Sequence, residues 1–195
     1  MMQVSFVPIV LWVAALACAG VAIWRGPRPI ARGFIIDRLL RYLFVFPLGL
    51  QGQWAFVGHV FFAEAAAESI GWATSPFQYE VGVANLGLGL ASLYAAFRGF
   101  EARLAVAIAA ACFLIGAGIG HIRDIVEAGN FAPGNAGPIM VTDFLTPIVV
   151  LVLLFFASGR WRPKSLATLA LEAELEVARE ALRSYRDALS DLGKE

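Results

Sequence analysis

Five runs of apolar residues, each long enough to cross a lipid bilayer as a helix, constrain this chain more than any other feature. They cover approximately residues 6–24, 34–67, 81–97, 104–122 and 139–157. A helix of about 20 residues spans the hydrocarbon core. Only 15% of the residues are charged, whereas a soluble domain has about 25% and leaves about a third of its unfolded surface in water. We therefore predict an all-α, polytopic membrane bundle over residues 1–160, with about five transmembrane helices.

The second run is too long for one upright span, because a helix over residues 34–67 would be about 50 Å long. Pro47 removes a backbone donor inside this run, and Gly49 and Gly52 follow it closely. We expect a kink there. We also expect the last turns, which carry Glu64 and Glu68, to emerge at the membrane surface.

The basic residues predict the orientation of the bundle, because cytoplasmic loops of membrane proteins are rich in Lys and Arg. Three groups fall on the same predicted side: Arg25, Arg28, Arg32, Arg38 and Arg41; Arg98 and Arg103; and Arg160, Arg162 and Lys164. Only Arg123 falls on the other side. We predict a multi-pass protein of the bacterial inner membrane, with its N-terminus outside and its C-terminus in the cytoplasm.

From Ser165 onward the chain becomes charged, and its apolar residues recur in alternating steps of four and three. They are Leu171, Leu175, Ala178, Leu182, Tyr185, Leu189 and Leu192. This heptad pattern is typical of a coiled coil. We predict a cytoplasmic coiled-coil helix over residues 164–193, which forms a homo-oligomer or binds a partner helix through residues 171–192. The alternative is an amphipathic helix that lies on the membrane or on its own bundle.

The outer half of the predicted bundle collects the polar residues that are costly to place in a membrane. His59 and His121, the only two histidines, fall at the same predicted depth on different spans. Imidazole and carboxylate groups from several helices can bind a metal ion. The hypothetical ligands of a divalent metal ion are His59, His121, Glu64, Glu80 and Asp124. The residues expected to support these ligands are Glu68, Asn85, Arg123 and Asp143.

Simpler interpretations of these residues stay open. The carboxylates could be solvated at helix ends, the histidines could be hydrogen-bonded core residues, and Asp143 could favour a helix N-terminus. Neither an HExxH motif nor paired Glu-x-x-His motifs are present. Glycines beside the histidines, including the pair Gly116 and Gly120, could pack helices closely or leave room for haem. Haem ligation by the two histidines is the less favoured alternative.

Two stretches resemble an uncharacterised family of small polytopic bacterial membrane proteins. The first comprises Ile70-Gly71-Trp72, Ser75-Pro76-Phe77-Gln78 and the run from Glu80 to Gly87; the second comprises Gly120-His121-Ile122 and the run from Pro133 to Pro138. The resemblance covers roughly residues 59–143. It implies a membrane fold and no assigned activity. Both loops in it, 71–78 and 129–138, are rich in turn formers, and we expect that either could cover a pocket.

Three functional hypotheses follow. The first is a metal-binding membrane protein, whose status as an enzyme stays open; the second is a proton- or cation-coupled carrier; the third is a non-enzymatic scaffold that oligomerises through its tail. The sequence has no Walker loop, GxSxG motif or Rossmann fingerprint, so nucleotide and serine-hydrolase chemistry have no support. The basic residues are too few and too close to the membrane to indicate nucleic-acid binding. Cys18 and Cys112 lie in apolar runs without metal-type spacing, and we interpret them as core residues.

Overall fold

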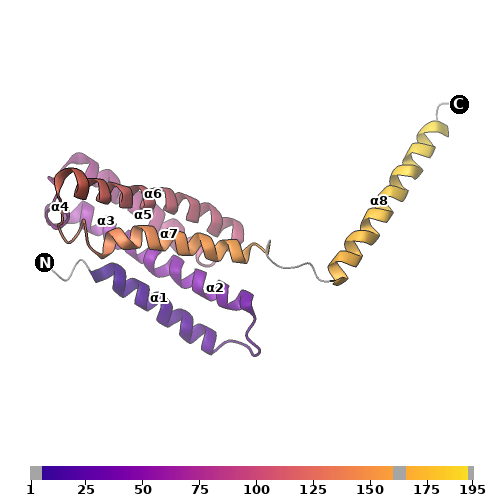
Figure 1. Cartoon of the computed structure of the whole chain (residues 1–195), viewed down its shortest axis with the longest axis horizontal. Helices are drawn as coiled ribbons and strands as arrows, with labels where there is room; N and C mark the ends of the chain where they lie inside the picture. Colours follow the sequence, from indigo (N-terminus) through magenta and orange to yellow (C-terminus); the bar gives the residue numbers. More distant parts are fainter. Residues whose placement is uncertain (1–5, 160–165, 193–195) are drawn as a thin grey trace. The chain divides into compact units, whose positions relative to one another are not determined.

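The structure is a computed structural model that describes residues 6–159 and 166–192, and within these ranges the regular elements are helices. In chain order they are α1 (Val7–Trp24), α2 (Arg32–Leu43), the π-helical segment η2 (Phe44–Leu50), α3 (Gln51–Phe61), α4 (Ala63–Ile70), α5 (Pro76–Ala95), α6 (Phe100–Ala128), α7 (Pro138–Ala157) and α8 (Leu166–Leu192) (Figure 1). The contacts divide the chain into two compact units, residues 1–159 and residues 160–195. The first is a helical bundle, and the second contains α8.

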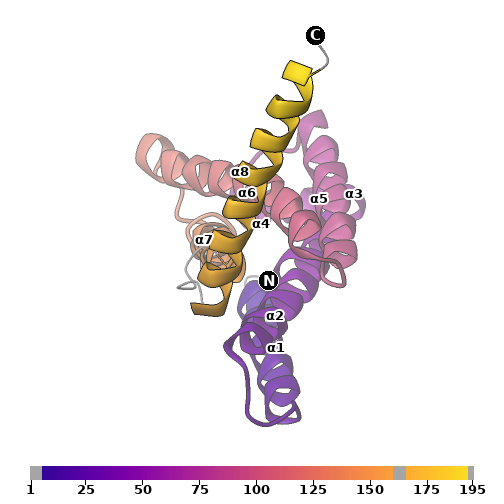
Figure 2. The same cartoon turned by 90° about the vertical axis from the view of Figure 1, so that its right-hand side faces the viewer.

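Within the bundle, helices that are neighbours in space pack as three main pairs. α1 packs on α2 and η2, α3 and η2 pack on α5, and α6 packs on α7. The views along and across the bundle show the same pairs (Figure 2). A hydrogen bond of 3.1 Å from Trp12 Nε1 to Thr146 Oγ1 connects α1 to α7. The bundle is therefore a single packed body rather than a string of separate hairpins.

Close backbone contact explains why α3 and α5 pair so tightly. A Cβ atom added at Gly52 would lie 2.8 Å from the carbonyl oxygen of Asn85 and 2.8 Å from Gly89 Cα. The predicted packing role of Gly116 and Gly120 on α6 is wrong, because an added Cβ at either would meet nothing within 4 Å. The packed glycine of that segment is Gly118, which lies against the ring of Phe144.

Three of the described helices are long and apolar enough to cross a membrane: α1, α6 and α7. They correspond to the predicted runs 6–24, 104–122 and 139–157. The third predicted run, 81–97, lies in α5, which begins at Pro76 and so includes Gln78 and Glu80. With these residues and Asn85, α5 is not among the helices that are apolar enough to cross a membrane by themselves. The membrane character of the chain follows from the three apolar helices.

The second predicted run, 34–67, is divided into several elements. Its backbone is continuously helical from Arg32 to Phe61, with Pro47 inside the π-helical segment η2. Phe62 leaves the helical conformation (φ −127°, ψ 41°), and α4 begins at the next residue. Glu64 and Glu68 are exposed on α4. The continuous helix of the second run therefore ends at Phe61, and Glu64 and Glu68 belong to the separate short helix α4.

The hydrophobic core occupies one end of the bundle. Its largest buried side chains come from α2, η2 and α7: Leu40, Leu43, Phe44, Val150 and Leu154. Small residues from the end of α5 and from the first half of α6, including Ala95 and Ala107, fill the space between them. The cavity described below begins beside this core, since Leu48 and Ala110 belong to both.

The unit that contains α8 is described by itself. Its large apolar side chains Leu171, Leu175, Leu182 and Tyr185 are all exposed, and Arg179 lies 4.0 Å from Glu176. The helix agrees in position with the predicted one, but pairing with another helix stays a prediction. Arg160, Arg162 and Lys164, together with both ends of the predicted helix at residues 164, 165 and 193, lie outside the described residues.

Candidate functional site

A cavity of about 480 Å³ lies inside the bundle, among α3, α4, α5, α6, α7 and the first turn of α1. Ala110 and His121 both line it, so the cavity follows α6 for about 16 Å. Most of its wall is apolar. Its polar lining residues are Gln51, His59, Ser69, Asn85, Ser92, His121 and Asp143, together with the indoles of Trp54 and Trp72.

His121 is held at one end of this cavity by Asn135. The two side chains are buried, and His121 Nδ1 lies 2.6 Å from Asn135 Oδ1. The amide nitrogen of Asn135 donates to the carbonyl oxygens of Asn130, at 2.8 Å, and of His121 itself, at 3.3 Å. Because these two bonds use the amide nitrogen, Oδ1 must be the atom that faces the ring. His121 Nδ1 is therefore the donor, and in the neutral ring Nε2 carries the lone pair.

The free nitrogen of His121 faces the carboxyl group of Asp143. His121 Nε2 lies 3.7 Å from Asp143 Oδ2, and both side chains are almost completely buried. This separation is too long for a direct hydrogen bond, and both residues line the cavity. A single polar atom placed between them can bond to both, as bridging groups do across gaps of this size.

Two loops cover the polar end of the cavity. The Trp72 ring stacks on the His121 ring, with centroids 6.2 Å apart and planes inclined by 16°. Trp72 Nε1 donates to Asp124 Oδ2 at 3.1 Å. Asn130 Nδ2 donates to the same oxygen at 2.6 Å and to the carbonyl of Ile70 at 2.8 Å. The loop after α4 and the loop after α6 are thereby joined over His121.

We call the two loops, residues 71–75 and 129–137, the cap, and a backbone hydrogen bond joins it to α4. The amide of Gly134 donates to the carbonyl of Ser69 at 2.9 Å, and a Cβ atom at residue 134 would lie 2.6 Å from that oxygen. Only glycine permits such an approach. The cap therefore depends on Gly134 as well as on Trp72, Asp124 and Asn130.

His59 and Gln51 add polar atoms to the cavity that lack a partner. Both residues lie on α3 and line the cavity. Within the part of the chain that the structure describes, the buried atoms His59 Nδ1 and Gln51 Oε1 have no hydrogen-bond partner. An unpaired polar atom in an apolar interior is costly, so each of these atoms offers a hydrogen bond to a molecule in the cavity.

The structure brings together some of the hypothetical metal ligands and separates others. His59 and His121 line the same cavity, whereas Glu64 and Glu80 are exposed on α4 and α5. Asp124 belongs to the cap, where it accepts hydrogen bonds from Trp72 and Asn130. Over residues 6–159 and 166–192, no group of three or more His, Cys, Asp or Glu side chains is placed to hold a metal ion.

The residues expected to support the ligands also divide. Asp143 lies beside His121, and Asn85 lines the cavity while donating to the carbonyl of Val81 at 2.9 Å. Glu68 is exposed. Arg123 is exposed and pairs with Glu127 at 2.9 Å. Sequence reasoning missed several site residues, among them Asn130, Asn135 and Trp72. All three lie in the two turn-rich loops, and Asn135 and Trp72 also belong to the stretches that carry the family resemblance.

The fold and the site define a class: a helical protein with membrane-capable helices and a partly open cavity, covered at one end by two loops over a buried histidine. A family of unknown function, DUF6790, matches residues 5–162, and the chain belongs to this family. The match includes the whole bundle and excludes α8. No curated protein and no solved structure matches the chain.

Proposed function

We propose that this protein binds an elongated, mostly apolar molecule from the membrane, with the polar group of that molecule held between His121 Nε2 and Asp143. The observation that carries the proposal is the cavity of about 480 Å³ with polar atoms at defined places in an apolar wall. Binding sites for small molecules commonly have volumes of about 300–1,000 Å³ and this mixture of many apolar and few polar lining groups.

The polar end of the cavity favours a hydroxyl group. A hydroxyl can both donate and accept a hydrogen bond, so one oxygen can donate to His121 Nε2 and accept from the Asp143 carboxyl when that carboxyl carries a proton. The separation of 3.7 Å between the two side-chain atoms leaves them without a direct bond to each other. The unpaired atoms of His59 and Gln51 offer further hydrogen bonds along the cavity.

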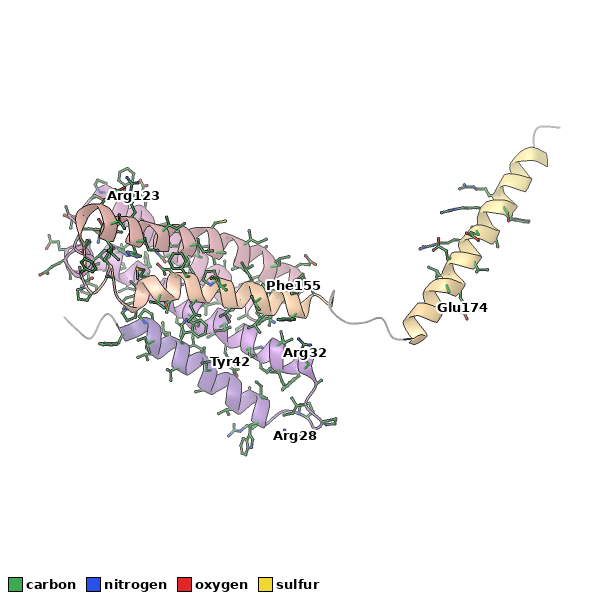
Figure 3. The ribbon with its side chains drawn as sticks, viewed as in Figure 1. Arg28, Arg32, Tyr42, Arg123, Phe155 and Glu174 are labelled. Atoms are coloured by element: carbon green, nitrogen blue, oxygen red, sulfur yellow. The ribbon has the colours of Figure 1, made fainter. Side chains whose placement is uncertain are left out.

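The proposed topology has five crossings, two more than the helices that meet the length and hydropathy requirement by themselves. The continuous helix from Arg32 to Phe61 would be about 45 Å long, which is enough for a crossing, and α5 packs along it. Arg32 and Arg123 lie at opposite ends of the bundle (Figure 3). With the basic residues concentrated at the Arg32 end, the proposed C-terminus is cytoplasmic in a bacterial inner membrane.

A metal centre is the weaker interpretation, because Glu64, Glu80 and Asp124 lie away from the two histidines. The carrier, scaffold and haem hypotheses stay predictions. Zinc content measured in the wild type and in a His59→Ala, His121→Ala double variant distinguishes the metal hypothesis. A stoichiometric ion that is lost in the double variant would favour the metal over the apolar ligand.

Thermal unfolding of the full chain in detergent tests ligand binding, with dodecanol as the probe and dodecane as its apolar counterpart. Dodecanol should raise the unfolding midpoint by several degrees, and dodecane should raise it less, because a ligand that binds only the folded state stabilises it. Ala117→Phe places a ring in the cavity and should abolish the dodecanol effect, since Ala117 lines it. Ala109→Phe on the exposed side of α6 is the matched control.

A second cavity variant tests whether the loss of the dodecanol effect in Ala117→Phe comes from misfolding. Ala55→Leu fills the cavity from α3 instead of α6, and it should weaken the dodecanol effect as well. If dodecanol stabilises the wild type, Ala117→Phe and Ala55→Leu equally, the alcohol binds elsewhere and the proposed function is wrong.

A further inference from the structure

The end of the bundle opposite the cap contains a buried arginine that organises a basic cluster. Arg103, near the start of α6, is only 6% exposed. Its Nη2 and Nε atoms donate to the carbonyls of Ala96 and Ala95, at 2.8 and 3.3 Å, and its Nη1 atom binds Asp37 Oδ1 at 2.9 Å. Arg103 thereby satisfies carbonyls at the C-terminus of α5 and fixes the carboxylate of Asp37 on α2.

Asp37 is shared among more cations than it can neutralise. Besides Arg103, its carboxylate contacts Arg38 at 2.7 Å and Arg41 at 3.8 Å. The three guanidinium groups and one carboxylate carry a net charge of about +2, since Arg is always protonated in proteins. In the region that the structure describes, the buried Nε atoms of Arg38 and Arg41 have no hydrogen-bond partner. The cluster therefore carries more positive charge than Asp37 neutralises, and two of its N–H donors have no partner.

Aromatic rings hold the two incompletely paired guanidinium groups in place. The Arg38 group lies 4.9 Å from the centroid of the Phe34 ring, and the Arg41 group lies 5.5 Å from that of Phe97. Stacking of this kind restricts a guanidinium while leaving its edge free for an anion. The position of each donor is thus set before any ligand arrives.

The charge around the cluster stays positive when neighbouring groups are included. Arg32 lies over the Phe156 ring and Arg98 over the Tyr94 ring. Arg32 and Phe155 lie at the end of the bundle away from Arg123 (Figure 3). Glu101, exposed in the first turn of α6, adds one negative charge. Half-buried cations with one carboxylate among three are costly without a further counterion.

The chemistry that fits is a phosphate group. Its oxygens accept two parallel hydrogen bonds from a guanidinium, and a phosphodiester supplies one negative charge. The cluster lies where the apolar stretch of α6 begins, at Leu104, beside a helix able to cross a membrane. Basic clusters at this level of a membrane protein attract anionic lipids.

We propose that Arg38 and Arg41, positioned by Asp37 and Arg103, bind the phosphate group of an anionic phospholipid. This site is separate from the cavity and does not depend on what the cavity binds. The lipid would be the missing counterion of the cluster and would connect α2 to the ends of α5 and α6.

Unfolding of the full chain in neutral detergent, titrated with phosphatidylglycerol, phosphatidylcholine or inorganic phosphate, tests this site. Phosphatidylglycerol should stabilise the wild type at lower concentration than phosphatidylcholine. Arg41→Gln should weaken the effect about fivefold, and the Arg38→Gln, Arg41→Gln double variant about 25-fold, because each basic residue near an anionic lipid contributes about that factor. Arg103 and Asp37 are left intact in both variants.

Arg123→Gln is the matched control, because it removes the same charge at the opposite end of the bundle (Figure 3) and should leave the effect of phosphatidylglycerol unchanged. Arg41→Lys keeps the charge without the two-pronged donor and should fall between Arg41→Gln and the wild type. Equal responses of the wild type and the double variant would overturn the site. Inorganic phosphate acting at the same concentration as the lipid would overturn the lipid as its source.

Discussion

The side-chain amide of Asn135 determines which nitrogen of His121 carries the proton. Its nitrogen is bonded to two backbone carbonyls, so its oxygen accepts from His121 Nδ1 at 2.6 Å. The consequence is that Nε2, the atom that faces Asp143 and the cavity, has its lone pair available when the ring is neutral. A loop residue thus sets the chemistry of a histidine on α6.

Replacing Asn135 should destabilise the protein strongly. Asn135→Ala leaves His121 Nδ1 and the carbonyls of His121 and Asn130 without this partner. We expect a loss of about 2–4 kcal/mol in unfolding free energy, because a buried polar group left unpaired costs about 1–3 kcal/mol. Urea unfolding in detergent measures it. Asn85→Ala, which removes one bond to the residue's own helix, should cost less than about 1 kcal/mol by the same reasoning; equal losses would contradict the account.

Substitutions at Trp72 should separate its two contacts. Trp72→Phe keeps a ring that can stack on His121 but removes the bond to Asp124, and we expect it to cost about 1 kcal/mol. Trp72→Ala removes both contacts and should cost more. Limited proteolysis of the 129–137 loop is the second measurement, with faster cleavage expected in Trp72→Ala. Identical cleavage of the wild type and Trp72→Ala would show that Trp72 does not hold the cap.

The two classes of helical glycine should respond in opposite ways to alanine. Gly52→Ala forces a methyl group to within 2.8 Å of α5 backbone atoms and should destabilise by about 1–3 kcal/mol, as overpacking does. Gly120→Ala meets open space and should be neutral or stabilising by up to about 1 kcal/mol, because alanine is the better helix former. The unfolding midpoints of both variants in detergent decide this. A larger loss of stability in Gly120→Ala than in Gly52→Ala would contradict the close packing of α3 on α5 at Gly52.

The apolar row of α8 provides a test of tail-mediated association. Leu182→Glu places a charge in the predicted seam, whereas Val177→Glu places one outside it, and both positions are exposed in the single chain. If the seam pairs with a second copy, Leu182→Glu should reduce the oligomeric mass of the full chain in detergent, measured by light scattering, and Val177→Glu should not. An unchanged mass in both variants would leave α8 without a role in self-association.

Hydropathy was sufficient to predict α1, α6 and α7, because an apolar run long enough for a bilayer has few other structures available. It could not divide the second run. Pro47 marked the first irregularity, where the structure has a π-helical segment, whereas nothing in the hydropathy pattern marks the break at the exposed residue Phe62. The position of that break also decides where Glu64 and Glu68 point, and both turn away into exposed positions on α4.

The candidate site was predictable only in part. Placing His59 and His121 at one depth followed from the spacing of the runs, and the structure places both along one cavity. The partners of His121 are Asn135 in the loop 129–137 and Asp143 on α7. Tertiary packing brings these segments to α6, and the sequence pattern does not contain that packing. Asp124 lies three residues after His121 on nearly the same helix face, one turn nearer the end of α6, where Trp72 and Asn130 donate hydrogen bonds to its carboxylate.

Histidine nitrogen NMR of the full chain in detergent tests the central claim most directly, since the protein has only two histidines and a His59→Ala variant assigns them. The account predicts that the His121 ring carries a proton at Nδ1, with an Nε2 signal that moves on addition of dodecanol and stays in place with dodecane. An Nε2 signal that dodecanol leaves unchanged, or a ring protonated at Nε2 alone, would contradict it.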